Sequence, residues 1–522
     1  MGIGGEIARE SVRGSVYLFL GSSLSTFISA ITSIIFGRLL GPDGYGLYSL
    51  SLTPSTLLLI ATNFGLNIGI VKYLSEYSRR GGYRGIKRLI WNALLFQLVS
   101  GSILSLTLFI FPEIFSRYII NRPEAAEYVR ITGILIFGTT LFTTLNQAFI
   151  GLNRSENTSL AMVTQALTKL VIGVGLVILG LGIYGAVIGH SISFLLGFSV
   201  GILLMFKLLS FDDGGESGGV GILDLIGFGF PVYLSNIIIS GLQVYRNYLF
   251  SIYTTDAEIG NFTAAINLSI VVIIFVNPII LTLFSSFSRL DKVDEIDVIK
   301  VLFNYSIKYS SIIILPITLF ISIMSEEVIY LFYGAGFRSA PIYLVLAVAP
   351  YLFIGGGIWI INSLLNGLGE TKIILKMYTL SLIISIPLYL ILMQRVGVLG
   401  VLASMLIASI ASLIYGLYYI DRNYDLKIRI YEVSKIYLVA GISALAIYIL
   451  KNTLAITSPY LAILIYGSSY LAIYTLLLPL LGGLTINDVD RLESTFTTVG
   501  FIGSPVILIL RMWRRLCELL HD

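Results

Sequence analysis

Fourteen long apolar segments constrain more than any other feature what this chain can fold into. A transmembrane helix needs about 20 mostly apolar residues. Segments of that length lie near 16–40, 45–71, 89–111, 129–151, 158–180, 183–206, 225–250, 259–284, 305–325, 340–367, 373–393, 397–420, 433–450 and 459–480. They are too long for buried strands. Because a helix satisfies its own backbone hydrogen bonds in lipid, the sequence predicts an all-α polytopic membrane protein with 14 transmembrane helices.

The composition excludes several functional classes. Only 12% of the 522 residues are charged, about half the usual share in a soluble domain. The excess of 33 Lys and Arg over 29 Asp and Glu is too small to indicate nucleic-acid binding. One cysteine and two histidines exclude a disulfide framework and a Cys- or His-based metal site. We expect no metal and no cofactor, and the chain contains no nucleotide-binding loop for direct use of ATP.

The basic residues predict the orientation in the membrane. With the N-terminus inside, the cytoplasmic connections and the tail carry 24 of the 33 Lys and Arg, and the opposite side carries seven. The remaining two, Lys169 and Arg246, lie inside predicted helices. Because basic residues concentrate in cytoplasmic loops, both termini are predicted to be cytoplasmic in a plasma-membrane protein.

The chain also repeats itself at an offset of 213 to 216 residues. The matches are Asn146 with Asn362, Gly151 with Gly367, Gly182 with Gly397, Gly185 with Gly400, and the turn at 43–48 with 256–262. An offset that spans an even number of helices makes the two halves parallel. The predicted parts are a six-helix lobe at 1–210, a glycine-rich linker at 211–222, a second six-helix lobe at 223–420, two further helices at 421–480, and an amphipathic cytoplasmic tail at 481–522.

The first hairpin carries a family resemblance. The stretch FGRLLGPDGYGLYSL at 36–50, followed by NFGLNIGIVKYLSEY at 63–77, resembles the opening of the polysaccharide-biosynthesis membrane proteins, or oligosaccharide-lipid flippases. Their superfamily also contains multidrug and toxin extrusion transporters and lipid II flippases. The resemblance covers residues 10–480. One departure is that the Asp-Arg pair often found in helix 7 of the family is Tyr245-Arg246 here.

The resemblance implies a function. It implies a flippase, not an enzyme, that moves a polyprenyl-(pyro)phosphate-linked oligosaccharide to the outer leaflet by alternating access. Its partners would be this substrate, membrane lipids, and glycosyltransferases or a polymerase of the same pathway. A charged pair at the first turn helps to gate the cavity in the family, which carries over here to Arg38 and Asp43. The alternative for these two residues is a local ion pair that shapes the hairpin.

The charged residues inside predicted helices bear on the charge of the substrate. None of the 29 carboxylates lies in the middle of a predicted helix, whereas a cation-coupled transporter is expected to place one there. Lys169 lies eleven residues from either end of its segment, roughly 16 Å from water along the axis. Lys169 is therefore expected to face a water-filled cavity or an anion, and Gln165, one turn earlier, extends the same polar face. The alternative is that Lys169 contacts the carbonyl end of another helix.

Other candidates come from polar stripes. Arg246 either contacts substrate or reaches the lipid headgroups, and it belongs to a helix with a polar face formed by Asn236, Ser240, Gln243 and Asn247. Asn63 and Asn67 lie one turn apart, as substrate ligands or as interhelical hydrogen-bond partners. The predicted substrate-binding set is thus Lys169, Arg246, Arg38, Asn63, Asn67, Gln165, Gln243 and Asn247, with Arg38 and Asp43 as the gate.

Two other functions remain open. A multidrug or small-solute exporter of the same superfamily is the main alternative, although the absence of an acidic residue in helices 1, 2 and 7 counts against it. A membrane enzyme such as a polymerase would be expected to have a large outer loop with catalytic residues. The longest outer connection, at 112–128, shows no recognisable catalytic arrangement.

The role of Lys169 is testable. Lys169→Ala is expected nearly to abolish translocation, because a phosphate crossing the bilayer would lose its cationic partner. Lys169→Arg should retain part of the activity, and Lys169→Glu should be worse than alanine because it repels the phosphate. The measurement is complementation of a flippase-deficient strain, with membrane abundance checked by immunoblotting. Normal complementation by Lys169→Glu at normal abundance would contradict this role and direct attention to Arg246.

Overall fold

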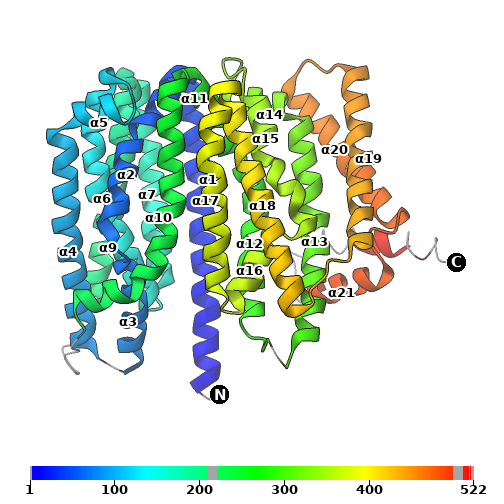
Figure 1. Ribbon diagram of the computed structural model, residues 1–522, viewed down its shortest axis with the longest axis horizontal. Helices are drawn as coiled ribbons and strands as arrows, with labels where there is room; N and C mark the ends of the chain where they lie inside the picture. Colours follow the sequence, from blue (N-terminus) through cyan, green and yellow to red (C-terminus); the bar gives the residue numbers. More distant parts are fainter. Residues whose placement is uncertain are drawn as a thin grey trace. The chain divides into compact units, whose positions relative to one another are not determined.

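The computed structural model describes residues 3–80, 82–209, 220–292, 294–497, 510–515 and 518. Within these ranges every regular element is a helix (Figure 1). The elements up to the predicted linker are α1 (Ile3–Ser51), α2 (Thr53–Asn63), α3 (Leu66–Arg80), α4 (Tyr83–Ile110), α5 (Pro112–Tyr118), a 3₁₀ turn (Pro123–Ala125), α6 (Ala126–Gly151), α7 (Ser155–Thr168), a π-helix (Lys169–Gly173), α8 (Val174–Leu176), a second π-helix (Val177–Leu181) and α9 (Gly182–Leu209).

The described elements after the predicted linker are also helices. Its elements are α10 (Ile222–Tyr253), α11 (Asp256–Leu268), α12 (Ile270–Phe287), α13 (Ile296–Ile323), α14 (Ser325–Tyr333), α15 (Ala340–Val348), a 3₁₀ segment (Ala349–Gly356), α16 (Ile360–Gly367), α17 (Thr371–Val396), α18 (Val398–Tyr424), α19 (Ile430–Leu454), α20 (Pro459–Leu480) and α21 (Ile486–Thr497). The prediction of an all-α polytopic membrane protein is confirmed.

The number of membrane crossings in the structure is less clear-cut than the fold class. By length and composition, the described residues contain 10 helices able to cross a membrane, or up to 12 if each of two bent helix pairs counts as one crossing. The two longest, Val16–Asn63 and Ser155–Leu209, have 48 and 55 residues, more than twice the length of one span. Left-handed glycines interrupt both of them, at Gly41 and at Gly180 and Gly182. These interruptions lie where the sequence separates two predicted segments, but the count of fourteen stays a prediction.

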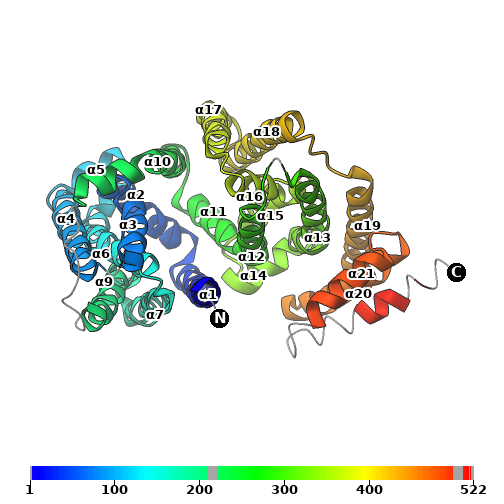
Figure 2. The same cartoon turned by 90° about the horizontal axis from the view of Figure 1, so that it is seen from below.

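The described chain forms two compact units. The first contains residues 1–268, 333–340 and 382–404, and the second contains 269–332, 341–381 and 405–522. In the first unit α4, α6 and α9 lie next to one another, and in the second α20 packs against α19 (Figure 2). The predicted lobe boundaries at 210 and 223 stay a prediction. Most of the predicted linker 211–222 and much of the tail 481–522 lie outside the described residues.

A reciprocal glycine crossing joins the end of α1 to α11 within the first unit. A Cβ on Gly46 would lie 1.8 Å from the carbonyl oxygen of Asp256, and a Cβ on Gly260 would lie 2.0 Å from that of Pro42. Any side chain here would force the two backbones apart. Gly46 and Gly260 are 214 residues apart, as are Pro42 and Asp256, so each half of the repeat contributes the same contact.

Other matched glycines have equivalent surroundings. Gly185 would place a Cβ 2.8 Å from the carbonyl carbon of Leu176, and Gly400 would place one 2.5 Å from that of Leu392. Gly182 and Gly397, which directly precede these helical turns, both have a positive φ, 50° and 62°. Glycines matched by the sequence offset thus make equivalent close contacts and have the same sign of φ, which supports the predicted duplication.

A buried ion pair holds α21 to the second unit. Lys308 of α13 is 5% exposed and Asp488 of α21 is 2% exposed, and their Nζ and Oδ2 atoms are 2.6 Å apart. The backbone N–H and the hydroxyl of Thr485 also donate to Asp488 Oδ2, at 2.9 and 2.6 Å, and Tyr309 donates to Oδ1 at 3.2 Å. Glu432 of α19 lies 3.4 Å from the same ammonium group. The start of the predicted tail is therefore bound to α13 through this ion pair.

This ion pair gives a prediction about pH and stability. Burial alone raises the pKa of the Asp488 carboxyl, but hydrogen bonds from Lys308 and Thr485 outweigh it and hold the pKa below its usual value of 3.8. The stabilisation is therefore complete above pH 3.8 and disappears as the pH falls through the lower folded-state pKa. Asp488→Asn should cost roughly 3 kcal/mol at pH 7, the low end for a broken buried pair because Glu432 remains.

Thermal unfolding of the purified protein in detergent, between pH 7 and pH 3, measures this effect. The difference between wild type and Asp488→Asn should shrink below pH 3.8. Asp425→Asn removes a carboxylate whose side chain is 72% exposed and is the matched control, with little change expected. Equal stability of wild type and Asp488→Asn at pH 7 would contradict the assignment.

Candidate functional site

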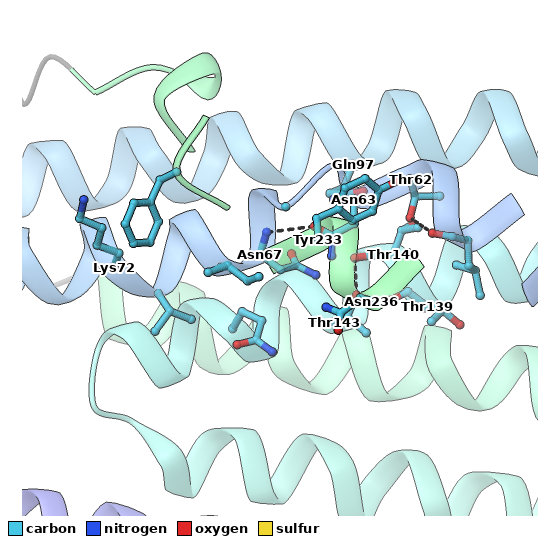
Figure 3. A pocket seen from close by; sticks show the side chains of 16 residues that line it. Thr62, Asn63, Asn67, Lys72, Gln97, Thr139, Thr140, Thr143, Tyr233 and Asn236 are labelled. Carbon is cyan, nitrogen blue, oxygen red and sulfur yellow. Dashed lines mark hydrogen bonds between the residues drawn. The ribbon is translucent and has the colours of Figure 1, made fainter. Parts of the chain in front are cut away.

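A cavity of about 630 Å³ opens in the first unit (Figure 3). Its walls come from α2, α3, α4, α6 and α10, and its volume falls within the roughly 300 to 1,000 Å³ of small-ligand sites. The lining residues are Leu59, Thr62, Asn63, Gly65, Asn67, Ile68, Val71, Lys72, Gln97, Thr139, Thr140, Thr143, Gln147, Phe228, Tyr233 and Asn236. Ten of these have uncharged polar side chains, an unusual concentration for membrane helices.

The break between α2 and α3 shapes the cavity. Phe64 and Gly65 both have a positive φ, 46° and 87°, so the chain leaves helical geometry for two residues. At this point the backbone of Gly65 meets that of Gly229 in α10, because a Cβ on Gly229 would lie 1.9 Å from the Gly65 carbonyl oxygen. The absence of both side chains lets α10 approach the break and close one wall.

A tyrosine fixes α10 against α2 next to this crossing. Tyr233 is 8% exposed, and its hydroxyl donates a hydrogen bond to the carbonyl of Ile60 in the last turn of α2. Its ring lies 6.0 Å from that of Phe64. The helix bends by 56° between Ile222–Phe230 and Val232–Tyr253, which turns both Phe228 and Tyr233 toward the cavity.

Three amide side chains line the cavity near the break. The Oδ1 atom of Asn63 accepts from the backbone N–H of Asn67 at 3.0 Å and so caps α3. The Oδ1 atom of Asn67 accepts from the Thr144 hydroxyl at 2.8 Å. The Oε1 atom of Gln97, which is 1% exposed, accepts from the Ser100 hydroxyl at 3.3 Å. Each amide oxygen is therefore engaged by the protein.

Threonine hydroxyls form another part of the wall. Those of Thr62, Thr140 and Thr143 donate to carbonyls of their own helices, at 2.9, 3.0 and 2.8 Å. Their oxygen lone pairs remain available as acceptors. The Oγ1 atom of Thr139 is buried without a hydrogen-bond partner in the described structure, so this polar group needs a ligand or water.

Lys72 supplies the cavity's charge. It is exposed, and its Nζ lies 3.8 Å from the centre of the Phe228 ring and 4.8 Å from that of Tyr73, in cation–π contact. Among the described residues no carboxylate lines the cavity and none forms an ion pair with Lys72. In Figure 3 Lys72 lies at one end of the group and Thr139 at the other. A ligand thus meets one positive charge and an uncharged polar surface.

The sequence-predicted residues are distributed over three places. Asn63 and Asn67 line the cavity. Gln165 lies elsewhere, where its Nε2 donates to the Ser193 hydroxyl at 2.9 Å between α7 and α9. Lys169 begins a π-helix and interacts electrostatically with His190, whose Nδ1 is 2.9 Å from the Tyr48 hydroxyl.

The remaining predicted residues lie apart from this cavity. Arg246 is over the ring of Phe262, 4.9 Å from its centre, and its Nε lies 3.4 Å from Asn247 Oδ1. Asn247 donates to the Thr53 hydroxyl at 3.1 Å. Gln243 is exposed on α10. Arg38 and Asp43 are exposed on either side of the break at Gly41, and their gating role stays a prediction.

Sequence reasoning missed much of the cavity. Gln97 of α4 and the α6 residues Thr139, Thr140, Thr143 and Gln147 were not candidates. A signal existed, because Thr139, Thr143 and Gln147 are spaced by four residues and make one polar stripe along the helix. Lys72 was not among the predicted site residues either, and its place in a cavity required the structure.

Comparisons with known proteins agree with this architecture. The sequence model of the polysaccharide biosynthesis protein family matches residues 11–291. The lipid II flippase MurJ of Bacillus subtilis is 18% identical over 494 residues, which are 87% of this chain and 91% of the relative. The probable low-salt glycan biosynthesis flippase Agl15 of Haloferax volcanii is 20% identical over 432 residues, 81% of this chain and 86% of the relative.

Solved structures show the same fold. A lipid II flippase MurJ in an inward closed conformation aligns with a TM-score of 0.71 and 18% identity, over 89% of this chain and 99% of that chain. An inward-facing multidrug resistance transporter of the MATE family, in the MOP superfamily, aligns with a TM-score of 0.63 and 18% identity, over 77% and 94%. At these identities the likeness establishes the fold of this multi-pass membrane protein.

The glycine crossing beside the cavity is testable with a matched pair on α10. Gly229→Ala should lower stability by roughly 1 to 3 kcal/mol, the cost of overpacking, because its methyl group would collide with the Gly65 backbone. Gly227→Ala has nothing within 4 Å of the new Cβ and should be neutral or stabilising by up to about 1 kcal/mol. Thermal unfolding in detergent compares the two. Equal melting temperatures would show that α10 does not approach the break this closely.

Proposed function

Because the chain belongs to the polysaccharide biosynthesis protein family, we propose that it is a flippase for polyprenyl-(pyro)phosphate-linked oligosaccharides. It moves them from the cytoplasmic to the outer leaflet by alternating access. The observation that carries this proposal is the cavity in the first unit, with ten uncharged polar residues, one lysine and, among its described lining residues, no carboxylate.

The chemistry of such a substrate matches this lining. A sugar has many hydroxyl groups that must exchange water for other hydrogen-bond partners, and unpaired polar groups are costly in an apolar medium. The amides and threonines offer these partners. The linking phosphate is anionic, and desolvating it costs several kcal/mol unless a cation compensates. Lys72, without a carboxylate to neutralise it in the described structure, can meet that phosphate.

The similar proteins support the same substrate class. The two relatives by sequence are named as a lipid II flippase and a probable glycan biosynthesis flippase. We carry the lipid-linked head group over to this chain as part of the proposal. We also propose that both termini are cytoplasmic in the plasma membrane, on the basis of the 24 to seven distribution of basic residues, and that glycosyltransferases or a polymerase of the same pathway act before or after it.

The alternative is an exporter of drugs or small solutes, since a multidrug transporter shares the fold. Cationic drugs require an anion or a negative surface in the binding site. The lining residues provide the opposite sign, which favours an anionic head group. A neutral solute would have no use for Lys72.

Reconstituted vesicles test the proposal. Purified protein in proteoliposomes should translocate a fluorescent short-chain polyprenyl phosphate glycoside, scored by protection from an added quencher. Lys72→Ala should slow translocation about tenfold, as expected for the loss of one charged contact of about 1.4 kcal/mol. Lys72→Arg should retain most of the activity because the charge survives.

The matched control is Lys376→Ala, which removes an exposed lysine of α17 that does not line the cavity. It should translocate at the wild-type rate. Absence of translocation of phosphate- and pyrophosphate-linked glycolipids by wild-type protein, with export of a cationic dye instead, would overturn the flippase proposal in favour of the exporter.

A further inference from the structure

The hydrogen-bond directions in the cavity wall show more than its polarity. Asn63, Asn67 and Gln97 each use the side-chain oxygen to accept a hydrogen bond from the protein. The assignment is unambiguous for Asn63, because a backbone N–H can only donate. In the described structure no acceptor is present for the NH₂ group of any of the three. Each amide therefore has an NH₂ group without a protein acceptor in the described structure, available to a ligand in the cavity.

Gln97 makes this observation strongest. It is 1% exposed, so its amide is withdrawn from bulk solvent, yet it lines the cavity and its nitrogen has no acceptor among the described residues. Such a group is satisfied when a ligand or water supplies an oxygen atom.

The start of α3 adds a positive potential in the same wall. This helix has 15 residues, and Gly65, Asn67 and Ile68 at its N-terminal end line the cavity. The N–H groups of Asn67 and Ile68 are already bonded, to Asn63 Oδ1 and to the Gly65 carbonyl, so the helix end acts through its dipole, the equivalent of about half a positive charge. Amide donors and the helix end thus favour the same kind of ligand atom.

We infer that the amide groups of Asn63, Asn67 and Gln97, next to the N-terminal end of α3, form an oxyanion-binding site in the cavity wall. The inference rests on the proposed function and names what this wall recognises. The oxyanion is either the linking phosphate of the lipid or the carboxylate of an acidic sugar, and the chemistry is the same for both.

Lys72 has a different role from this site. It lies six residues after the start of α3, about 9 Å along the helix axis, and it is exposed. An exposed cation attracts an anion from a distance, whereas neutral donors in the cavity wall hold it by geometry. The hydroxyls of Thr140 and Thr143 in α6, whose protons are already used, leave acceptor oxygens for the donor hydroxyls of a sugar.

Two isosteric substitutions test the donor array in the full-length protein. Asn63→Asp keeps an oxygen that accepts from Asn67 and so keeps the α3 cap, because Asp caps as well as Asn. Its second oxygen replaces the NH₂ donor with a negatively charged acceptor. Gln97→Glu makes the same exchange while the bond from Ser100 is kept. Gln394→Glu is the matched control, since Gln394 is exposed on α17 and donates to Tyr253 outside the cavity.

The assay is calorimetric binding to the purified protein in detergent, with three probes. They are an alkyl phosphate glycoside of a neutral disaccharide, the same alkyl glycoside without phosphate, and an alkyl glycoside of a uronic acid. We expect Asn63→Asp and Gln97→Glu each to weaken binding of an oxyanion probe at least tenfold. Binding of the neutral probe should change less than twofold, and Gln394→Glu should match wild type.

The outcomes separate the two sources of the oxyanion. Selective loss for the phosphate probe assigns the site to the lipid link, and selective loss for the uronic acid assigns it to the sugar. Wild-type affinity for both oxyanion probes in both variants, with unchanged melting temperatures, would overturn the inference. Gln97→Met, which removes the donors without adding charge, should show an intermediate loss and covers the case in which Gln97→Glu does not fold.

Failure of the oxyanion-site inference can be distinguished from failure of the flippase proposal. Wild-type translocation of a phosphate-linked glycolipid in vesicles, together with unchanged binding by the variants, would refute only the oxyanion site. Absence of wild-type translocation would refute the proposed function, whatever the variants bind.

Discussion

The bilayer leaves no water for backbone N–H and C=O groups, and this constraint governs the whole structure. The chain stays helical across each span and leaves helical geometry mainly at glycine, which adopts a positive φ without strain. Gly41, Gly65, Gly182 and Gly397 mark such places. Where the backbones of two helices must meet, glycine again makes this possible, as Gly46 shows by its contact with the carbonyl of Asp256.

The break at Phe64 and Gly65 links this constraint to chemistry. Interrupting a helix frees backbone groups that must be satisfied, and the Asn63 side chain satisfies one of them by accepting from Asn67. A single amide has a separate donor group, so the oxygen of Asn63 serves the fold while the nitrogen remains free for a ligand. The same division occurs at Gln97. The cavity's recognition surface is therefore a consequence of how the broken helix is capped.

Two lysines, one buried in the second unit and one exposed in the first, have different partners. In the second unit Lys308 is paired with Asp488 at 2.6 Å, and the charge serves to hold α21 in place. In the first unit Lys72 contacts only aromatic faces, so its charge is not neutralised within the described structure. A charge that the protein leaves without a counter-ion next to a polar cavity is one that an anionic ligand can neutralise.

The sequence by itself determined the fold class, because the bilayer thickness sets the length and apolar character of each spanning segment, and both are local properties of the sequence. It also determined the family, through the hairpin at 36–50, and the glycine positions of the repeat, because close backbone contacts tolerate no other residue. It placed Asn63 and Asn67 among the candidates from their spacing. The tertiary structure alone decided that Gln97 and the threonines of α6 join them, and that Gln165 serves a contact with Ser193 instead. Which face of a helix contacts which neighbour depends on the rotation of the helix about its axis and on the places where helices are interrupted. The direction of each hydrogen bond depends in turn on that neighbour. Neither can be derived from the spacing of residues along one helix.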